Sequence, residues 1–92
     1  MTDGQLYLAN VRRLPCVLAA TRACSGRVHA HHAGPRPGMG RKAADDTAIP
    51  LCAQHHQEWH NAGGFFGMLT KVVKARWVED AIAATRARLA PF

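Results

Sequence analysis

Two compact groups of histidines, each close behind a cysteine, constrain the fold of this chain more than any other feature of its sequence. The six histidines are arranged as His29, His31 and His32 after Cys24, and His55, His56 and His60 after Cys52. Imidazole and thiolate are the side chains that most often bind Zn²⁺ in proteins. Grouped in this way, they predict metal binding rather than a scatter of solvated histidines.

The chain is long enough for one small domain with a thin hydrophobic core. It has 92 residues, and although 48% of them are hydrophobic, only 7% are aromatic. Folding of a chain of this size removes roughly 64% of its extended surface from water, which leaves a marginal core. Such domains usually gain stability from disulfides, a metal or a partner. We therefore expect a single domain over residues 1–92 that a metal ion helps to stabilise.

An excess of basic residues favours a phosphate-rich partner. Twelve Lys and Arg residues against six Asp and Glu residues give a formal net charge of +6, which favours nucleic acid over acidic protein assemblies. No apolar run approaches the roughly 20 residues that cross a bilayer, and residues 1–4 lack the basic start of a secretory signal. We expect a cytoplasmic protein with no membrane association and no evident small-molecule substrate. The oligomeric state is left open.

Two short strands flank a loop rich in glycine and proline. Residues 27–32 lie between two glycines and fit a strand of about six residues. Residues 34–40 (Gly-Pro-Arg-Pro-Gly-Met-Gly) can form neither a helix nor a ladder strand. Residues 48–51 fit a second strand, in which Pro50 requires an edge or a strand end. The sequence thus predicts two strands joined by a long loop.

Two helices are predicted after the strands. Residues 53–61 lack Pro and Gly and end before Gly63-Gly64, a strong helix terminator. Residues 74–89 carry side chains at the spacing of a buried helix face: Val78, Ala81, Ile82, Thr85 and Leu89. Residues 1–13 are weakly patterned, and we expect three of them to cover one face of the core: Leu6, Leu8 and Val11. The predicted fold class is α+β.

The cysteines favour a structural zinc site. Their odd number, in a chain without a secretory signal, argues against a disulfide framework. They form a plausible tetrahedral Cys₃His set with one histidine: Cys16, Cys24, Cys52 and His55. A site of this kind contributes on the order of 10 kcal/mol of folding free energy. The spacing of Cys16 and Cys24 is wider than the usual two to four residues, and the alternative is that both are small buried apolar residues.

A second metal site is predicted on another face of the helix over residues 53–61. His56 and His60 are four residues apart, one turn of helix, and can bind the same ion. His55 lies about 100° around the axis and is directed toward Cys52 instead. Gln57 stands where a zinc-protease motif needs Glu directly after the first His, which excludes that class. The alternative is a polar helix whose histidines are solvated.

The order of these elements resembles the HNH endonucleases, which enclose one divalent ion between a β-hairpin and a helix (the ββα-metal or His-Me finger). The motifs that carry the resemblance are His31-His32, Gly38-Met39-Gly40, Lys42, Asp45, Pro50-Leu51-Cys52, His55-His56 and His60. They span roughly residues 14–66 and look like the short HNH proteins of phages and of prophages in bacterial hosts. The resemblance implies a small ββα-metal finger with a zinc knuckle and an additional C-terminal helix over about residues 74–89.

Carried over position by position, the resemblance implies that His32 is the general base. Three further histidines would bind the catalytic ion: His31, His56 and His60. The Asn of the family motif has no counterpart here, and either Asp45 or Asp46 stands in its place to orient the base. The implied activity is metal-dependent DNA endonuclease, hydrolysing phosphodiester bonds to 5′-phosphate and 3′-hydroxyl ends. The catalytic ion is left open among Mg²⁺, Mn²⁺, Ni²⁺ and Zn²⁺.

These residue types suit phosphodiester hydrolysis. A neutral imidazole with an ordinary pKa of about 6.5 is a competent base at neutral pH, and a divalent ion stabilises the leaving oxygen. On a strand, His31 and His32 point to opposite faces, which is consistent with separate tasks. Three basic side chains of the loop are expected to hold phosphates: Arg36, Arg41 and Lys42. The alternative function is a non-catalytic, zinc-stabilised module that binds nucleic acid.

Overall fold

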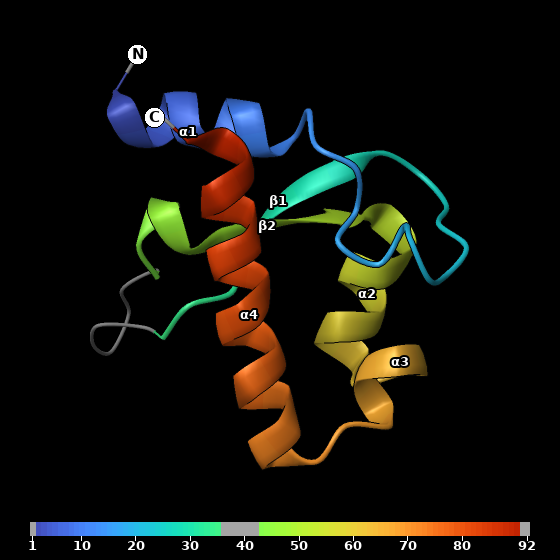
Figure 1. The fold of residues 1–92 in the computed structure, drawn as a ribbon. Helices are drawn as coiled ribbons and strands as arrows, with labels where there is room; N and C mark the ends of the chain where they lie inside the picture. Colours follow the sequence, from blue (N-terminus) through green and yellow to red (C-terminus); the bar gives the residue numbers. More distant parts are fainter. Residues whose placement is uncertain (1, 36–42, 91–92) are drawn as a thin grey trace.

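Two antiparallel strands form the centre of the fold (Figure 1). The computed structural model describes residues 2–35 and 43–90. β1 (Val28–His32) pairs with β2 (Ala48–Cys52) in a register that sets Val28 opposite Cys52 and His32 opposite Ala48. Both strands lie within one residue of their predicted bounds. With the helices around them they give a small α+β fold, which confirms the predicted class.

β2 runs through the core, and all five of its residues are buried. Pro50 lies in the middle of the strand, opposite Ala30. A two-stranded sheet leaves one side of each strand without a ladder partner, so the missing N–H of a proline is tolerated there. The carbonyl oxygen of Pro50 accepts a hydrogen bond from the backbone N–H of Val17 at 2.9 Å. That bond attaches the loop carrying Cys16 and Cys24 to the sheet.

α2 (Ala53–Asn61) follows β2 without a loop and has the predicted bounds. Cys52 is both the last residue of β2 and the N-cap of α2, and its Sγ accepts a hydrogen bond from the backbone N–H of His55 at 3.4 Å. The helix ends at Ala62, which adopts a left-handed conformation with φ of 51°. A four-residue helix, α3 (Gly64–Gly67), comes next and buries Phe66.

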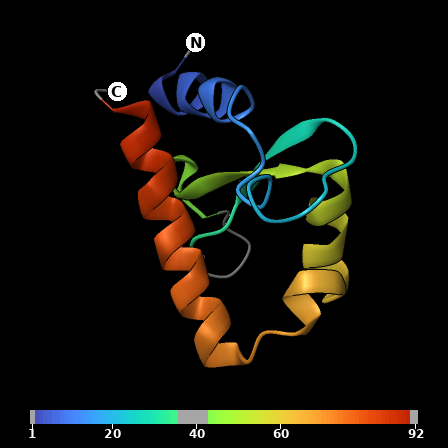
Figure 2. The ribbon, with the colours of Figure 1, turned by 45° about the vertical axis from the view of Figure 1, so that its right-hand side comes forward.

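α4 (Lys71–Leu89) packs along β2 and buries Ala81 and Thr85, in agreement with the predicted apolar face. The helix begins three residues before its predicted start because Thr70 is its N-cap, and the Thr70 side chain accepts a hydrogen bond from the backbone N–H of Val73 at 3.2 Å. In Figures 1 and 2, α4 lies near one end of the two strands, and the α2–α3 pair lies near the other end. Residues 68–70 connect α3 to α4 at the end of the molecule far from the sheet.

The N-terminal segment forms a helix that the sequence pattern did not predict, α1 (Asp3–Val11). Its capping box consists of Thr2, whose side chain accepts from the Gln5 backbone N–H at 3.1 Å, and Gln5, whose Oε1 accepts from the Thr2 N–H at 2.9 Å. Tyr7 and Val11 face the core, whereas Leu6 is 46% exposed. The expectation that Leu6 covers the core is therefore wrong, because a helix turns it about 100° away from Tyr7.

The loop between α1 and β1 returns to the start of α2. Gly26 adopts φ of 87°, a conformation that favours glycine, and a Cβ there would lie 2.6 Å from the Cβ of Ala53. Next to it, the carbonyl oxygen of Ser25 accepts a hydrogen bond from the backbone N–H of Gln54 at 3.1 Å. This close approach brings Cys24 to the N-terminal end of α2.

A single 3-10 turn, η1 (Asp45–Thr47), leads into β2 and packs against α1. It holds the two aspartates that the sequence leaves as alternatives for orienting His32. Among the helices in the described part of the chain, none is long and apolar enough to cross a membrane.

Candidate metal centres

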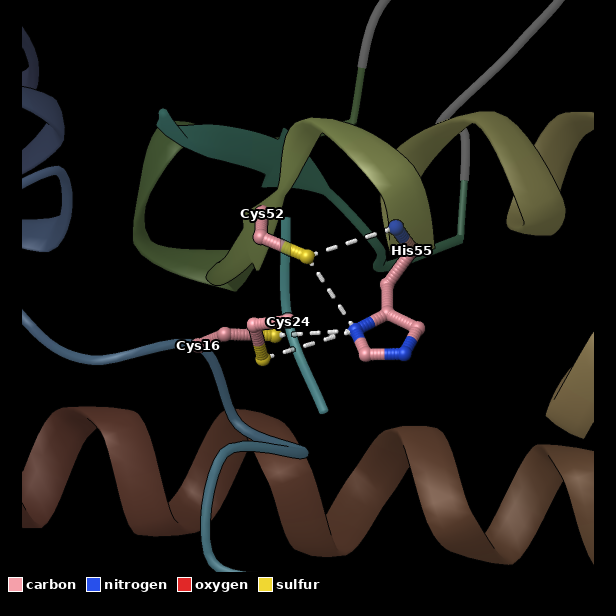
Figure 3. Close-up of side chains that lie close together, drawn as sticks. All are labelled: Cys16, Cys24, Cys52 and His55. Carbon is pink, nitrogen blue, oxygen red and sulfur yellow. Dashed lines mark hydrogen bonds between the residues drawn. The ribbon is translucent and has the colours of Figure 1, made fainter. Parts of the chain in front are cut away.

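The three cysteines and His55 meet at one point below the sheet (Figure 3). The Nδ1 atom of His55 lies 3.2 Å from Sγ of Cys52, 3.5 Å from Sγ of Cys16 and 3.7 Å from Sγ of Cys24. Tetrahedral zinc, with Zn–S of about 2.3 Å and Zn–N of about 2.0–2.1 Å, places sulfur and nitrogen about 3.6 Å apart. The four ligand atoms therefore have separations close to those that such an ion needs.

The electrostatics of the three thiols also favours a cation between them. Burial raises the pKa of Cys52, but hydrogen bonds from the backbone N–H groups of His55 and Ser25 and from the other thiols outweigh it, so that this pKa is lowered overall. Desolvation of its sulfur, which faces the cluster, and the neighbouring sulfurs of Cys16 and Cys52 raise the pKa of Cys24 to about 12. Crowded thiolates repel one another, and a bound cation removes that repulsion.

This cluster could bind a metal such as zinc. Cys16 and Cys52 are buried, but Cys24 is exposed. The alternative, in which Cys16 and Cys24 are both small buried apolar residues, is therefore wrong for Cys24. Its exposed side chain instead turns its sulfur toward His55.

A second cluster consists of His31 from β1 and His56 and His60 from α2, with one ligand atom of each within 4.8 Å of the others. The Nε2 atoms of His56 and His60 are 3.2 Å apart, close to the separation of about 3.3 Å for two imidazoles on one tetrahedral ion. The ring of His31 lies 4.9 Å from that of His56 and 5.5 Å from that of His60, between centroids. β1 and α2 thus bring the three predicted ligands together.

His31 fits the role of a ligand because its Nε2 is buried and, among the described residues, has no hydrogen-bond partner. A buried nitrogen without a partner is costly, and a cation between the three rings would satisfy it. Burial, with the nearby His56, His60, His32 and Lys74, lowers the pKa of His31 to about 4. The ring is therefore neutral at physiological pH, which is the form that binds metals.

The site is walled on one side by aromatic rings and open on the other. Trp59 lies 4.7 Å from His31 between ring centroids and 5.1 Å from Phe66. The ammonium of Lys74, in α4, sits 4.3 Å from the centre of the Trp59 ring, which is cation–π distance. His60 is exposed. A ligand can therefore reach the cluster from the His60 side, with one positive charge nearby.

His32 points away from the three-histidine cluster and toward η1. Its Nε2 lies 2.8 Å from Oδ1 of Asp45. Asp46 is turned elsewhere: its Oδ2 lies 3.3 Å from Nη2 of Arg86, and its carbonyl oxygen accepts from Nε of Arg86 at 2.9 Å. Of the two aspartates that the sequence leaves open, Asp45 is the one that contacts His32.

His29 is a member of the site that the sequence analysis did not assign. Its Nδ1 lies 2.8 Å from Nδ1 of His56. The signal was available, because residues 29 and 31 lie on the same face of a strand, and a ligand at His31 therefore places His29 over α2 as well. The three loop residues expected to hold phosphates lie outside the described residues: Arg36, Arg41 and Lys42.

Comparison of the chain with protein-family models, with curated proteins and with solved structures finds no match in any of the three. Its function is therefore inferred from its own side chains and their geometry.

Proposed function

We propose that this protein is a metal-dependent DNA endonuclease of the HNH type, which hydrolyses phosphodiester bonds with a histidine general base and one divalent ion. The observation that carries the proposal is the convergence of His31, His56 and His60 within 4.8 Å, with the adjacent His32 held apart by a hydrogen bond to Asp45. A nuclease of this kind needs both a cation site and an imidazole that stays off the cation. This chain offers both on neighbouring residues of β1.

His31, His56 and His60 would hold the divalent ion, with Mg²⁺, Mn²⁺, Ni²⁺ and Zn²⁺ as the candidates. When bound, the ion supplies charge that polarises the phosphate and stabilises the departing 3′ oxygen. The chain favours the neutral form of two of these imidazoles: burial lowers the pKa of both His31 and His56, with the neighbouring histidines adding to the effect. Exposed His60 leaves the site open toward a phosphate.

His32 would take the proton from the attacking water. Asp45 contacts its Nε2, and, among the described residues, Nδ1 has no hydrogen-bond partner and can accept that proton. Asp45 then accepts the Nε2–H bond and stabilises the imidazolium that forms, as an orienting carboxylate does in other histidine bases. The side chains of His32 and Asp45 are 26% and 46% exposed, so water reaches them.

The cysteine cluster supports this proposal indirectly. Cys52 ends β2 and caps α2, the helix that carries His56 and His60. Zinc at this cluster would fix the start of that helix relative to the loop that carries Cys16 and Cys24. Zinc is the ion proposed here, because Cys₃His is a usual ligand set for structural zinc.

DNA is the proposed substrate because its phosphates match the charge of the chain. The formal net charge is +6, and Lys74 lies beside the histidine cluster. The proposed phosphate contacts on the loop are Arg36, Arg41 and Lys42. Binding of this kind positions the duplex without reading its sequence and weakens as salt is raised.

The test is cleavage of supercoiled plasmid by purified protein with each of the four ions, compared with His32→Ala. We expect wild type to nick the plasmid in at least one ion. His32→Ala should lose cleavage while it keeps its metal content, circular dichroism and DNA affinity, because His32 does not lie in either metal cluster. Wild type that binds DNA but cleaves with none of the ions would instead indicate the non-catalytic, zinc-stabilised binding module.

A further inference from the structure

His29 is a second histidine of β1 that contacts α2, and the proposed reaction does not use it. Nδ1 of His29 lies 2.8 Å from Nδ1 of His56, and the two rings meet edge to face, with centroids 5.1 Å apart and planes at 77°. Both side chains are half-buried. Two imidazole nitrogens at this distance form a hydrogen bond only if one carries the proton and the other offers a lone pair.

The other nitrogen of His56 decides which way that hydrogen bond runs. Nε2 of His56 faces Nε2 of His60 at 3.2 Å, on the side of the ring where the ligand atoms converge. Binding a cation there requires the Nε2 lone pair, so the proton of neutral His56 must sit on Nδ1. His56 then donates, and Nδ1 of His29 accepts. A neutral imidazole carries only one N–H, so a His29 ring that accepts at Nδ1 carries its proton on Nε2.

We propose that His29 is a positioning residue for the histidine metal site: it accepts the Nδ1–H of His56, and so fixes both the ring orientation and the tautomer that leaves Nε2 free to bind the ion. A histidine ligand commonly donates its second N–H to a nearby acceptor, and removal of that acceptor typically weakens metal binding 10- to 100-fold. The proposal rests on metal binding by the three-histidine cluster, but not on nuclease activity.

His29 is not a fourth ligand in this arrangement. Its Nδ1 contacts His56 on the nitrogen opposite to the one that faces His60. The group of histidines whose ligand atoms converge contains His31, His56 and His60 but not His29. One lone pair of His29 cannot both accept from His56 and bind the ion.

The experiment measures Ni²⁺ and Mn²⁺ affinity by calorimetry, on protein whose cysteine cluster has first been loaded with zinc. His29→Ala removes the acceptor, whereas His29→Asn keeps a polar oxygen near the position of Nδ1. We expect His29→Ala to weaken binding about 10- to 100-fold and His29→Asn to recover most of that loss. Unchanged zinc content and circular dichroism show that the variants are folded. Equal affinity of wild type and His29→Ala would overturn the proposal.

A second readout is ¹⁵N NMR of the histidine rings, which reports the proton position independently of any activity. In wild type with Zn²⁺ at the histidine site, we expect His56 to be bound through Nε2 and to carry its proton on Nδ1. We expect His29 to carry its proton on Nε2. A metal-bound nitrogen on His29, or a proton on Nδ1 of His29, would refute the assignment. If wild type binds neither Ni²⁺ nor Mn²⁺ in the calorimetry, the proposed reactive site fails. If it binds either ion and only the His29 effects are missing, this inference alone fails.

Discussion

Nε2 of His32 and Oδ1 of Asp45 are 2.8 Å apart, although 13 residues and the loop between the strands separate them in the chain. η1 brings Asp45 to the end of β1, where the backbone N–H of Ala33 also donates to the carbonyl oxygen of Thr47 at 3.2 Å. Asp46 is equally close in sequence but pairs with Arg86. The two neighbouring carboxylates therefore offer a matched pair of variants.

Asp45→Asn is expected to lower DNA cleavage about 10- to 100-fold, the usual cost of losing an orienting partner, because the amide no longer stabilises imidazolium at His32. Asp46→Asn removes the same charge one residue away but disturbs the contact with Arg86 and not the one with His32. Its cleavage rate should stay within about twofold of wild type. Plasmid nicking rates at saturating metal provide the comparison. Equal losses in both variants would show that net charge, not orientation of His32, is what matters.

Gly4 of α1 lies against the carboxylate of Asp45, and a Cβ at this position would collide with that side chain. Gly4→Ala should therefore push Asp45 away from His32 and reduce cleavage severalfold. The fold should persist, because the side chain that must move is flexible and exposed. Gly63→Ala is the control, since a Cβ there meets nothing within 4 Å. Cleavage rate and melting temperature are measured together, and wild-type cleavage by Gly4→Ala would contradict the expected displacement.

The number of metal ions bound by wild type and by variants should show that each of the two clusters holds its own ion. We expect wild type to hold two ions per chain, one at each group of converging ligands. Cys52→Ser should lose zinc and unfold, because a structural zinc contributes on the order of 10 kcal/mol and Cys52 also caps α2. His60→Ala should lose only the other ion and keep its helical circular dichroism, since His60 is exposed. Elemental analysis after dialysis gives the stoichiometry, and a folded, zinc-free Cys52→Ser would refute the structural role.

The part of each candidate metal cluster that lies at or next to α2 could be predicted from local spacing, whereas the ligands from the loop and from β1 were predicted from residue type and from the family resemblance. Four-residue spacing places His56 and His60 on one face of a helix, and three-residue spacing turns His55 back to Cys52. The two strands were equally predictable, since Gly26 and Gly34 flank β1 and a short apolar run marks β2. What could not be predicted depends on contacts between distant elements.

The partner of His32 is one example of such a contact. Asp45 and Asp46 are indistinguishable in sequence, and the choice is made by Arg86, 40 residues further along the chain. The spacing of His29 and His31 places both on the face of β1 toward α2, but the hydrogen bond between His29 and His56 also depends on how β1 lies over α2. α1 was missed for a different reason: its capping box, Thr2 with Gln5, is a short signal in a segment with little apolar periodicity.

The last prediction concerns the pH dependence of stability, and His31 determines its sign. Burial is the main cause that lowers the pKa of folded His31 to about 4, from an ordinary value of 6.5. Below pH 6.5 the unfolded chain takes up a proton that the folded chain does not. Stability is therefore fully present above about pH 6.5 and is lost as the pH falls toward 4.

The loss from this residue should amount to no more than about 3.5 kcal/mol, since one pKa unit corresponds to about 1.4 kcal/mol. His31→Met keeps a side chain of similar size without the titrating ring. Between pH 7 and pH 5, the unfolding free energy of wild type should therefore fall by more than that of the variant. Urea unfolding at the two pH values, on zinc-loaded protein without other divalent ions, measures that difference. Parallel pH profiles for the two proteins would show that His31 is not the buried neutral imidazole described here.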